Sequence, residues 1–339
     1  MNSRYSRQIL FPPIGNAGQN KLQKKHVLII GAGALGSANA EMLARAGVGT
    51  ITIADRDYVE WSNLQRQQLY SEQDVQEQLP KAIAAKRRLE AINSDVTIRV
   101  YVKDMMAREL EQLIKDVDVI VDATDNFETR FIINDISQKY KIPWIYGACV
   151  GSYGLSYTIV PGQTPCLSCL LQNVPLGEAT CDTAGIISPA VSMVVAHQVA
   201  ETLKLLTESY SALRTGLVSF DIWKNEYSSV NVQSFKNAGC PSCGADAVYP
   251  YLQSGNVSKT TVLCGRDTVQ IRPAHAVSVA LDQHAKRLEN IVEQLVYNRY
   301  LLSFTVEGKR FVLFKDGRVL VHGTKNETEA KQLFHRYFG

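Results

Sequence analysis

A glycine-rich segment near the N-terminus constrains the fold more than any other part of the sequence. Gly31, Gly33 and Gly36 form a G-x-G-x-x-G pattern within KHVLIIGAGALGSANAEMLARAGVGTITIADRD. Residues 27–30 are continuously apolar, as in a strand buried on both faces, and residues 37–46 favour a helix. Glycines here let the backbone turn sharply and approach a phosphate, which a helix N-terminus attracts. The segment therefore predicts a β–α–β unit that binds a phosphate-containing ligand.

The alternation of strands and helices continues along the chain. The patterns predict a basic helix over 80–92, a strand over 96–102, a helix over 108–114 and a buried strand in DVDVIVDATDN. A helix over 128–140, an apolar strand in IPWIYGACV and a long helix over 188–208 follow. Repeated βα units of this length imply a mostly parallel sheet with helices on both faces. We expect a Rossmann-like, doubly wound α/β domain over residues 1–246.

The last part of the chain has a different character. Residues 247–259 are rich in turn formers and predict a linker. Residues 260–339 read as strand, helix, three strands and helix, with hairpin signals at Glu307-Gly308 and Asp316-Gly317. A chain of 339 residues exceeds the usual size of one domain. We therefore expect a second, small α+β module, in which the sequence shows no catalytic constellation.

Composition limits the possible locations and partners. The chain is 45% hydrophobic and 20% charged, as in an ordinary soluble globular protein, and no apolar run approaches the ~20 residues of a membrane span. The first residues, MNSRYSRQILFPPIG, lack the apolar region of a signal peptide, so a cytoplasmic location is predicted. A net charge of +3 is too small to predict nucleic acid or a membrane as the main partner. Seven cysteines in a reducing compartment favour metal ligation or catalysis over disulfides.

Polar residues after the second strand decide between two kinds of ligand. Asp55 ends that strand and could hold a ribose hydroxyl, which together with the glycines makes NAD the default ligand. The following segment, DRDYVEWSNLQRQQLY, adds Asp57, Asn63, Gln65 and Arg66 on the ligand side of the sheet. A dinucleotide enzyme has no evident need for a guanidinium there. A triphosphate does, because the two N–H groups of the guanidinium fork can bind its phosphate oxygens together.

Two further residues strengthen the case for ATP. Lys81 follows Pro80 at the start of a helix and offers a second cation. Asp125 follows a buried strand, at the carboxyl edge where ligands collect, and a carboxylate there suits Mg²⁺. The combination favours an ATP and Mg²⁺ site, and an NAD-dependent oxidoreductase is the alternative that the glycine pattern alone supports.

Two identically spaced cysteine pairs predict a metal centre. Cys166 and Cys169 form one C-x-x-C pair, and Cys240 and Cys243 form another. Four thiolates in two such pairs make a closed, tetrahedral structural zinc site, which we favour over free thiols or a redox pair. Such a site would tie distant segments of the chain together.

Three cysteines lie outside these pairs. Cys181 has polar and small neighbours that suggest an exposed loop, where the thiol could have a functional role or be incidental. Cys149 and Cys264 lie in apolar, strand-like contexts and are predicted to be packing residues.

Several motifs in a fixed order resemble one protein family. RYSRQ, GAGALG, D-x-D followed by SNLQRQ, PK, ATDN and the two cysteine pairs cover roughly residues 4–245. Over this range the sequence closely resembles the MoeB/ThiF family, the bacterial relatives of ubiquitin-activating enzymes. The resemblance implies a homodimeric, Mg-ATP-dependent adenylyltransferase that activates the C-terminal glycine of a ubiquitin-like sulfur carrier and releases pyrophosphate. The carrier would be of ThiS or MoaD type, ending in Gly-Gly, and would serve thiamin thiazole or molybdopterin biosynthesis.

The resemblance also assigns roles to individual positions. Gly33 matches the nucleotide loop, Asp55 the ribose contact and Asp125 the magnesium-associated aspartate. Asn63, Arg66 and Lys81 match residues around the triphosphate, and Arg7 matches an arginine that reaches the phosphates from the partner subunit. Cys181 matches a cysteine that joins the carrier covalently in some members. The complete predicted nucleotide site consists of Gly31, Gly33, Gly36, Asp55, Asp57, Asn63, Arg66, Lys81, Asp125 and Asn126.

Other interpretations stay open at this point. The chain has no CRxGxRS-like loop after residue 245, so a fused sulfurtransferase is not expected. A non-catalytic protein that docks the carrier through residues 260–339 is one alternative to an enzyme. The small module could equally bind a cysteine desulfurase as the sulfur donor, or the other subunit.

Overall fold

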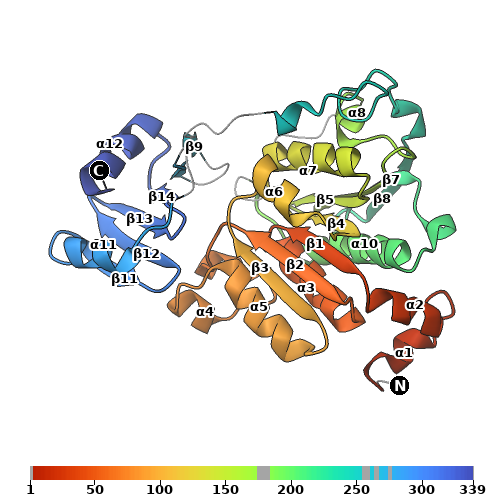
Figure 1. Cartoon of the computed structure of the whole chain (residues 1–339), viewed down its shortest axis with the longest axis horizontal. Helices are drawn as coiled ribbons and strands as arrows, with labels where there is room; N and C mark the ends of the chain where they lie inside the picture. The colour runs from red at the N-terminus through yellow and green to blue at the C-terminus, as the bar shows by residue number, and fades with distance from the viewer. Residues whose placement is uncertain (1–2, 174–183, 254–259, 263–266, 274–276, 339) are drawn as a thin grey trace. The chain divides into compact units, whose positions relative to one another are not determined.

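The computed structural model describes residues 3–173, 184–253, 260–262, 267–273 and 277–338 (Figure 1). The chain forms two compact units, Met1–Ser254 and Gly255–Gly339, and each is described by itself. Among the described residues, no helix is long and apolar enough to cross a membrane.

The first unit contains an eight-stranded sheet with the strand order β3-β2-β1-β4-β5-β6-β7-β8. The strands β3 (Thr97–Val102), β2 (Thr50–Asp55), β1 (His26–Ile30), β4 (Val119–Asp122) and β5 (Trp144–Val150) run parallel. The strands β6 (Tyr153–Ile159), β7 (Gly216–Asp221) and β8 (Glu226–Asn231) extend the sheet antiparallel. The predicted doubly wound, mostly parallel α/β sheet is thereby confirmed, and the antiparallel extension is an addition that the sequence patterns did not predict.

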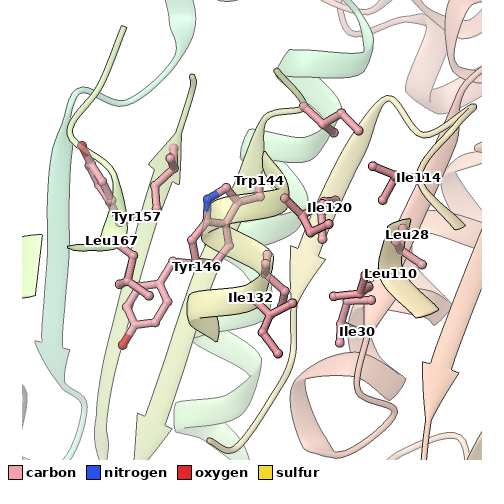
Figure 2. Packing of buried hydrophobic residues seen from close by; sticks show 14 of the residues in the cluster. Leu28, Ile30, Leu110, Ile114, Ile120, Ile132, Trp144, Tyr146, Tyr157 and Leu167 are labelled. Atoms are coloured by element: carbon pink, nitrogen blue, oxygen red, sulfur yellow. The ribbon is translucent and has the colours of Figure 1, made fainter. Parts of the chain in front are cut away.

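Helices cover both faces of the sheet. On one face, the helix α3 (Ala34–Ala46) contacts both α5 (Lys81–Ile92) and α10 (Ser188–Leu206). On the other face, α6 (Ala107–Leu113) and α7 (Phe127–Tyr140) cover Leu28 and Ile30 of β1 and Trp144 of β5 (Figure 2). Alternate residues of each strand serve the two faces, which explains why β1 is buried along its whole length.

Short helices complete the first unit. They are η1 (Ser3–Tyr5), α1 (Ser6–Ile9), α2 (Gly15–Leu22), η2 (Trp61–Asn63), α4 (Glu72–Gln76), α8 (Leu167–Leu171), η3 (Tyr210–Ala212), η4 (Gln233–Phe235) and η5 (Pro250–Leu252). In η5 the ring of Tyr251 stacks on Phe131 of α7 with a centroid distance of 4.5 Å. The backbone N–H of Tyr251 donates to Asp135 Oδ2 at 2.9 Å. The unit therefore runs to Ser254, beyond the expected end at residue 246, because part of the expected linker packs on α7.

The second unit contains a six-stranded antiparallel sheet. Its strands are β11 (Glu293–Tyr297), β12 (Leu301–Val306), β13 (Lys309–Phe314), β14 (Val319–His322), β10 (Thr268–Ile271) and β9 (Thr260–Val262), in this spatial order. The helices α11 (Leu281–Leu288) and α12 (Glu327–Phe338) contribute Leu288 and Leu333 to its core, where Phe304 and Phe311 stack. An α+β module is thus present, with its own apolar core.

The strand count of this module corrects the sequence prediction. The expected order was strand, helix, three strands and helix, whereas the structure has two strands before α11 and four after it. The strand β11 was missed because its residues are mostly exposed and lack an apolar face. Both predicted hairpins are confirmed: Glu307 and Gly308 have positive φ between β12 and β13, and Gly317 has φ +82° between β13 and β14.

Candidate functional site

The three glycines of the pattern, Gly31 and Gly33 in the loop between β1 and α3 and Gly36 in the first turn of α3, have three different reasons to be glycine. Gly31 has φ +95°, and a Cβ on Gly36 would lie 1.9 Å from Gly31 O, so both positions exclude side chains for the sake of the fold. A Cβ on Gly33 would meet only Gln67 Nε2, at 3.9 Å. No side chain caps the N-terminus of α3, which begins at the next residue. The loop therefore leaves an open approach to free helix amides, as an anion site requires.

Asp55, at the end of β2, fixes the shape of this loop. Its Oδ2 accepts the Ala32 N–H at 2.6 Å, and its Oδ1 accepts the Asp57 N–H at 2.6 Å. The Tyr70 hydroxyl donates to Ala32 O at 2.6 Å from the other side. Burial raises the pKa of Asp55, and the positive charge of Lys81 and the two amide bonds oppose that shift. The loop is thus preorganised before any ligand binds.

Lys81 is a buried cation at the first position of α5. Its side chain is only 4% exposed, and Nζ lies 3.5 Å from Asp57 Oδ2. The position is set by the Lys81 N–H, which donates to Asp57 O at 2.9 Å, and by a β-bridge between Tyr58 and Pro80. A buried ammonium group is costly without a counter-charge, and Asp57 provides one. The predicted Lys81 and Asp57 therefore lie together beside Asp55.

The SNLQRQ segment places its polar residues in different environments. Asn63 is fully buried and its Oδ1 accepts the Glu60 N–H at 3.1 Å, so it stabilises the turn that contains η2. Arg66 is half-buried and donates from Nη1 to Ser62 O at 2.8 Å. Gln65 is exposed, with Nε2 3.5 Å from Ile186 O.

Gln67, the last residue of this segment, was not predicted to belong to the site. It is 3% exposed, and its Nε2 is the atom nearest to the open side of Gly33. Its Oε1 has no hydrogen-bond partner among the described residues. The repeated glutamines of QRQQ gave no signal that this particular one is buried beside the glycine loop.

The loop after β4 holds Asp125 at the same edge of the sheet. The Asp125 side chain is 70% exposed, and Asn126 Nδ2 donates to its Oδ1 at 3.2 Å. Asn126 also caps α7, because its Oδ1 accepts the Thr129 N–H at 2.9 Å. The predicted pair is therefore present, with Asp125 facing solvent and Asn126 tied to the helix.

A buried ion pair beneath this loop was missed in the sequence. Arg130 Nε donates to Asp122 Oδ2 at 3.0 Å, and Nη2 donates to Thr124 O at 2.7 Å and Gly147 O at 3.2 Å. Burial lowers the pKa of Arg130, but the Asp122 carboxylate outweighs it and the net pKa is raised. The pair connects the end of β4 to the middle of β5 and, through Thr124, to the loop that carries Asp125.

Arg56, the middle residue of D-x-D, is a cation of this site. Like Arg130, it was not assigned to the site from the sequence patterns. Its guanidinium lies 3.5 Å from Asp104, 3.9 Å from Asp57 and 4.0 Å from Asp125, measured between nitrogen and carboxylate oxygen. Burial lowers its pKa, and these carboxylates together raise it above the ordinary value. Arg56 therefore connects acidic residues that follow three different strands.

Other predicted residues lie elsewhere. Arg7 is exposed on α1. Cys181 and Cys264 lie outside the described residues, and Cys149 is half-buried at the end of β5.

The four predicted zinc ligands form one cluster. The Sγ atoms of Cys166, Cys169, Cys240 and Cys243 all lie within 4.8 Å of one another. The Sγ of Cys166 lies 3.8 Å from that of Cys169 and 3.7 Å from that of Cys240, and the Sγ atoms of Cys169 and Cys243 lie 3.6 Å apart. Zn–S bonds of about 2.3 Å in a tetrahedron separate the sulfurs by about 3.8 Å, whereas a disulfide needs about 2.0 Å. The four sulfurs thus fit a tetrahedral metal ion and not two disulfides.

Polar contacts join the first cysteine segment to α7 and to the second cysteine segment. The Leu167 N–H in α8 donates to Asn134 Oδ1 at 2.8 Å, and Ser168 Oγ lies 3.2 Å from Ser242 Oγ. A Cβ on Gly244 would lie 2.4 Å from Ala238 O, so the second turn requires glycine. Burial raises the pKa of the Cys169 thiol to about 11, and a bound cation would reverse this shift. The donor set is suited to a closed structural zinc site.

Comparison with known proteins identifies the family. The sequence model described as the ThiF family matches residues 5–242. The chain belongs to the ThiF family. The chain is 55% identical over 341 residues to "Sulfur carrier protein ThiS adenylyltransferase" of Bacillus subtilis, with all of both chains covered.

Further ThiF-family comparisons cover less of the chain. "Sulfur carrier protein ThiS adenylyltransferase" of Escherichia coli is 36% identical, over 73% of this chain and 97% of that protein. The crystal structure of E. coli MccB with ATP superimposes with a TM-score of 0.62 at 26% identity, over 72% of this chain and 75% of MccB. The ThiF-family match lies entirely within the first unit.

Proposed function

We propose that this ThiF-family chain uses ATP to adenylate the C-terminal carboxylate of a ubiquitin-like sulfur carrier of ThiS type. The observation that carries the proposal is the open glycine loop at Gly33, with Lys81 and Asp55 nearby, in a chain 55% identical over its full length to a ThiS adenylyltransferase. The two relatives with ThiS in their names favour a ThiS-type over a MoaD-type carrier, and thiamin over molybdopterin biosynthesis. The same relatives argue against the NAD-dependent oxidoreductase.

The two metals have different proposed roles. Four cysteines around zinc leave no open position, so this ion would be structural. Mg²⁺ prefers carboxylate oxygens and keeps several waters, and the exposed carboxylate of Asp125 fits that preference. When bound there with ATP, Mg²⁺ would neutralise charge on the phosphates. No part of the proposal requires either metal to react.

The chemistry asks the protein mainly to position charges. The carrier's carboxylate oxygen attacks the α-phosphorus of ATP, a new O–P bond forms, and the bond from the α-phosphorus to the oxygen that bridges it to the β-phosphorus breaks as pyrophosphate leaves. In the proposal Asp55 holds the ribose, and Lys81 and Arg66 orient the triphosphate and offset charge on the leaving group. Lys81 is already fixed by burial and by Asp57, so it loses little freedom on binding.

Three elements of the proposal concern partners. Arg7, exposed on α1, is proposed to reach the phosphates of a second copy in a homodimer. Cys181 is proposed to attack the adenylated carbonyl of the carrier: a thioester forms, the bond from the carbonyl carbon to the phosphate oxygen breaks, and AMP leaves. Mass spectrometry of the reaction would detect the adduct. A cysteine desulfurase is the proposed sulfur donor.

ATP–pyrophosphate exchange tests the function directly. We expect exchange with a ThiS-type carrier ending in Gly-Gly and much less with a MoaD-type carrier. Lys81→Ala and Arg66→Ala should lower the exchange rate by about 10²-fold or more, as for other transition-state charge contacts. Lys86→Ala is the matched control, because Lys86 lies on the same helix but pairs at the surface with Glu90. Wild-type exchange by the Lys81 variant would refute its assigned role.

A further inference from the structure

We propose that Arg56 makes the binding of a divalent cation depend on the nucleotide. The inference rests on the proposed function, because it concerns the metal that accompanies ATP. In the ligand-free protein the guanidinium lies 4.0 Å from the Asp125 carboxylate, and its positive charge disfavours a cation there, so the free ion binds weakly and enters with the triphosphate. Arg56 is thus a residue that discriminates a metal–nucleotide complex from the metal alone.

The first support is the position of the guanidinium. Its Nη2 lies 4.0 Å from Oδ1 of Asp125, the carboxylate proposed to bind the metal. Mg–O distances are about 2.1 Å, so an ion bound to that oxygen would lie no more than about 6 Å from Nη2. The Arg56 side chain is only 17% exposed, whereas the Asp125 side chain is 70% exposed, so the guanidinium is fixed in the protein while the metal side of the pair is open to water. The repulsion is therefore strongest at low ionic strength.

The second support is the balance of charge at this edge of the sheet. The carboxylates of Asp55, Asp57, Asp104 and Asp125 face the two cations Arg56 and Lys81. Removal of the guanidinium therefore leaves four acidic groups with one cation, a stronger attraction for a divalent ion. Arg56 and Lys81 partly neutralise the site while no nucleotide is bound.

The third support is that Arg56 has an alternative partner when Asp125 is taken by a metal. Asp104, in the loop after β3, is only 9% exposed and lies 3.5 Å from Nη1, nearer than Asp125 does to Nη2. A triphosphate brings negative charge and further oxygen ligands, so it offsets the repulsion between the metal and Arg56. Asp104 then retains the guanidinium while Asp125 turns to the metal.

Binding of Mn²⁺ to the purified full-length zinc-loaded protein tests the proposal. Free Mn²⁺ is measured by electron paramagnetic resonance at low ionic strength, with and without a non-hydrolysable ATP analogue. We expect Arg56→Gln to bind Mn²⁺ without nucleotide at least tenfold more tightly than wild type. Adding Asp125→Asn should abolish that gain. Arg45→Gln is the matched control, because Arg45 lies at the surface and pairs with Glu41.

Two outcomes would overturn the proposal. The first is a nucleotide-free Mn²⁺ affinity of a folded Arg56→Gln variant within twofold of wild type. The second uses Asp104→Asn, which is available even if Arg56→Gln does not fold. This substitution removes the alternative partner of Arg56 and should raise the Mn²⁺ concentration needed for half-saturation in the presence of nucleotide. An unchanged half-saturation concentration contradicts the proposal. Because these readouts need no carrier, failure of pyrophosphate exchange would affect only the proposed function.

Discussion

A methyl group added at Gly36 would lie 1.9 Å from Gly31 O, whereas one added at Gly33 would meet only Gln67 Nε2 at 3.9 Å. Gly36→Ala must therefore force apart β1 and α3, and we expect it to destabilise the first unit by about 3 kcal/mol or more. Gly33→Ala should fold normally but weaken ATP binding by at least tenfold, because the methyl occupies the approach to the helix amides. Thermal unfolding and calorimetric titration with an ATP analogue measure the two effects.

The comparison between these variants is decisive because the same substitution is made at two glycines only three positions apart, one just before α3 and one in its first turn. Tryptophan fluorescence suits the unfolding measurement, since Trp61, Trp144 and Trp223 all lie in the first unit. Equal ATP affinity of Gly33→Ala and wild type would show that the nucleotide does not approach the loop at Gly33.

His26 gives the first unit a predictable dependence on pH. Its Nδ1 donates to Asp116 O and its Nε2 accepts from Thr52 Oγ1, and burial lowers its pKa below 6.5. The unfolded chain therefore binds a proton at a higher pH than the folded chain does. The stability that neutral His26 contributes is present above pH 6.5 and is lost as the pH falls through the lower folded-state pKa.

Urea unfolding at pH 7.5 and pH 5.5 checks this prediction. We expect His26→Gln to lose less stability than wild type between these two values. Burial also lowers the pKa of His197, so His197→Gln should reduce the pH dependence in the same direction. An identical loss in wild type and both variants would exclude the histidines as its source.

Among individual residues, those whose chemical type is unusual for their place could be predicted from the sequence. Glycines after a strand, Lys81 at a helix start and paired cysteines all stand out without a structure, and the cysteine cluster is confirmed. Arg56 and Gln67 did not stand out, because their significance depends on atoms from other loops. The partner carboxylate of Arg56 at Asp104 lies far from it in the sequence, and the open side of Gly33 is visible only in three dimensions.

Zinc removal tests the role of the cysteine cluster at the level of elements. The cluster joins α8 to the turn that carries Cys240 and Cys243, segments far apart in the sequence. We expect one zinc ion per chain, and Cys240→Ser or a strong chelator should lower the Tm by on the order of 10 °C. Atomic absorption and thermal unfolding give the two readouts.

Cys149→Ser is the matched control for the loss of zinc and the lowered Tm. Cys149 lies at the end of β5, outside the cluster, so its substitution should leave the zinc content unchanged. A native chain with no bound metal, unaffected by chelation, would show that the four thiols pack without an ion.

Elements with strong periodicity were predicted well, and those stabilised by tertiary contacts were not. The apolar run of β1 and the helical pattern of α7 gave almost their final bounds. In β8 every residue is exposed, so the strand carries no apolar alternation, and it forms because β7 provides a pairing edge. The strand β11 of the second unit was missed for the same reason, because most of its residues are exposed.

At the scale of the whole molecule, the two units have separate cores. The apolar cluster around Trp144 draws only on the first unit, and the cluster around Phe304 and Phe311 only on the second. Composition revealed the division, but the end of the first unit depended on the stacking of Tyr251 on Phe131, which no local pattern indicates. The E. coli relative aligns over 97% of its own length with only 73% of this chain. A ThiF-family protein can therefore exist without a counterpart of the second unit.

Truncation tests whether the first unit is self-sufficient. A chain that ends at Ser254 retains the complete sheet, the cysteine cluster and η5 on α7. We expect its Tm, measured by tryptophan fluorescence, to equal that of the first unit in the full-length chain. We also expect it to bind one zinc ion and to bind ATP with unchanged affinity.

A chain that ends at residue 246 loses the Tyr251 ring stack and its bond to Asp135. It should be less stable by about 2 kcal/mol. If both chains lost ATP binding equally, the second unit would be part of the nucleotide site, contrary to the assignment of that site to the first.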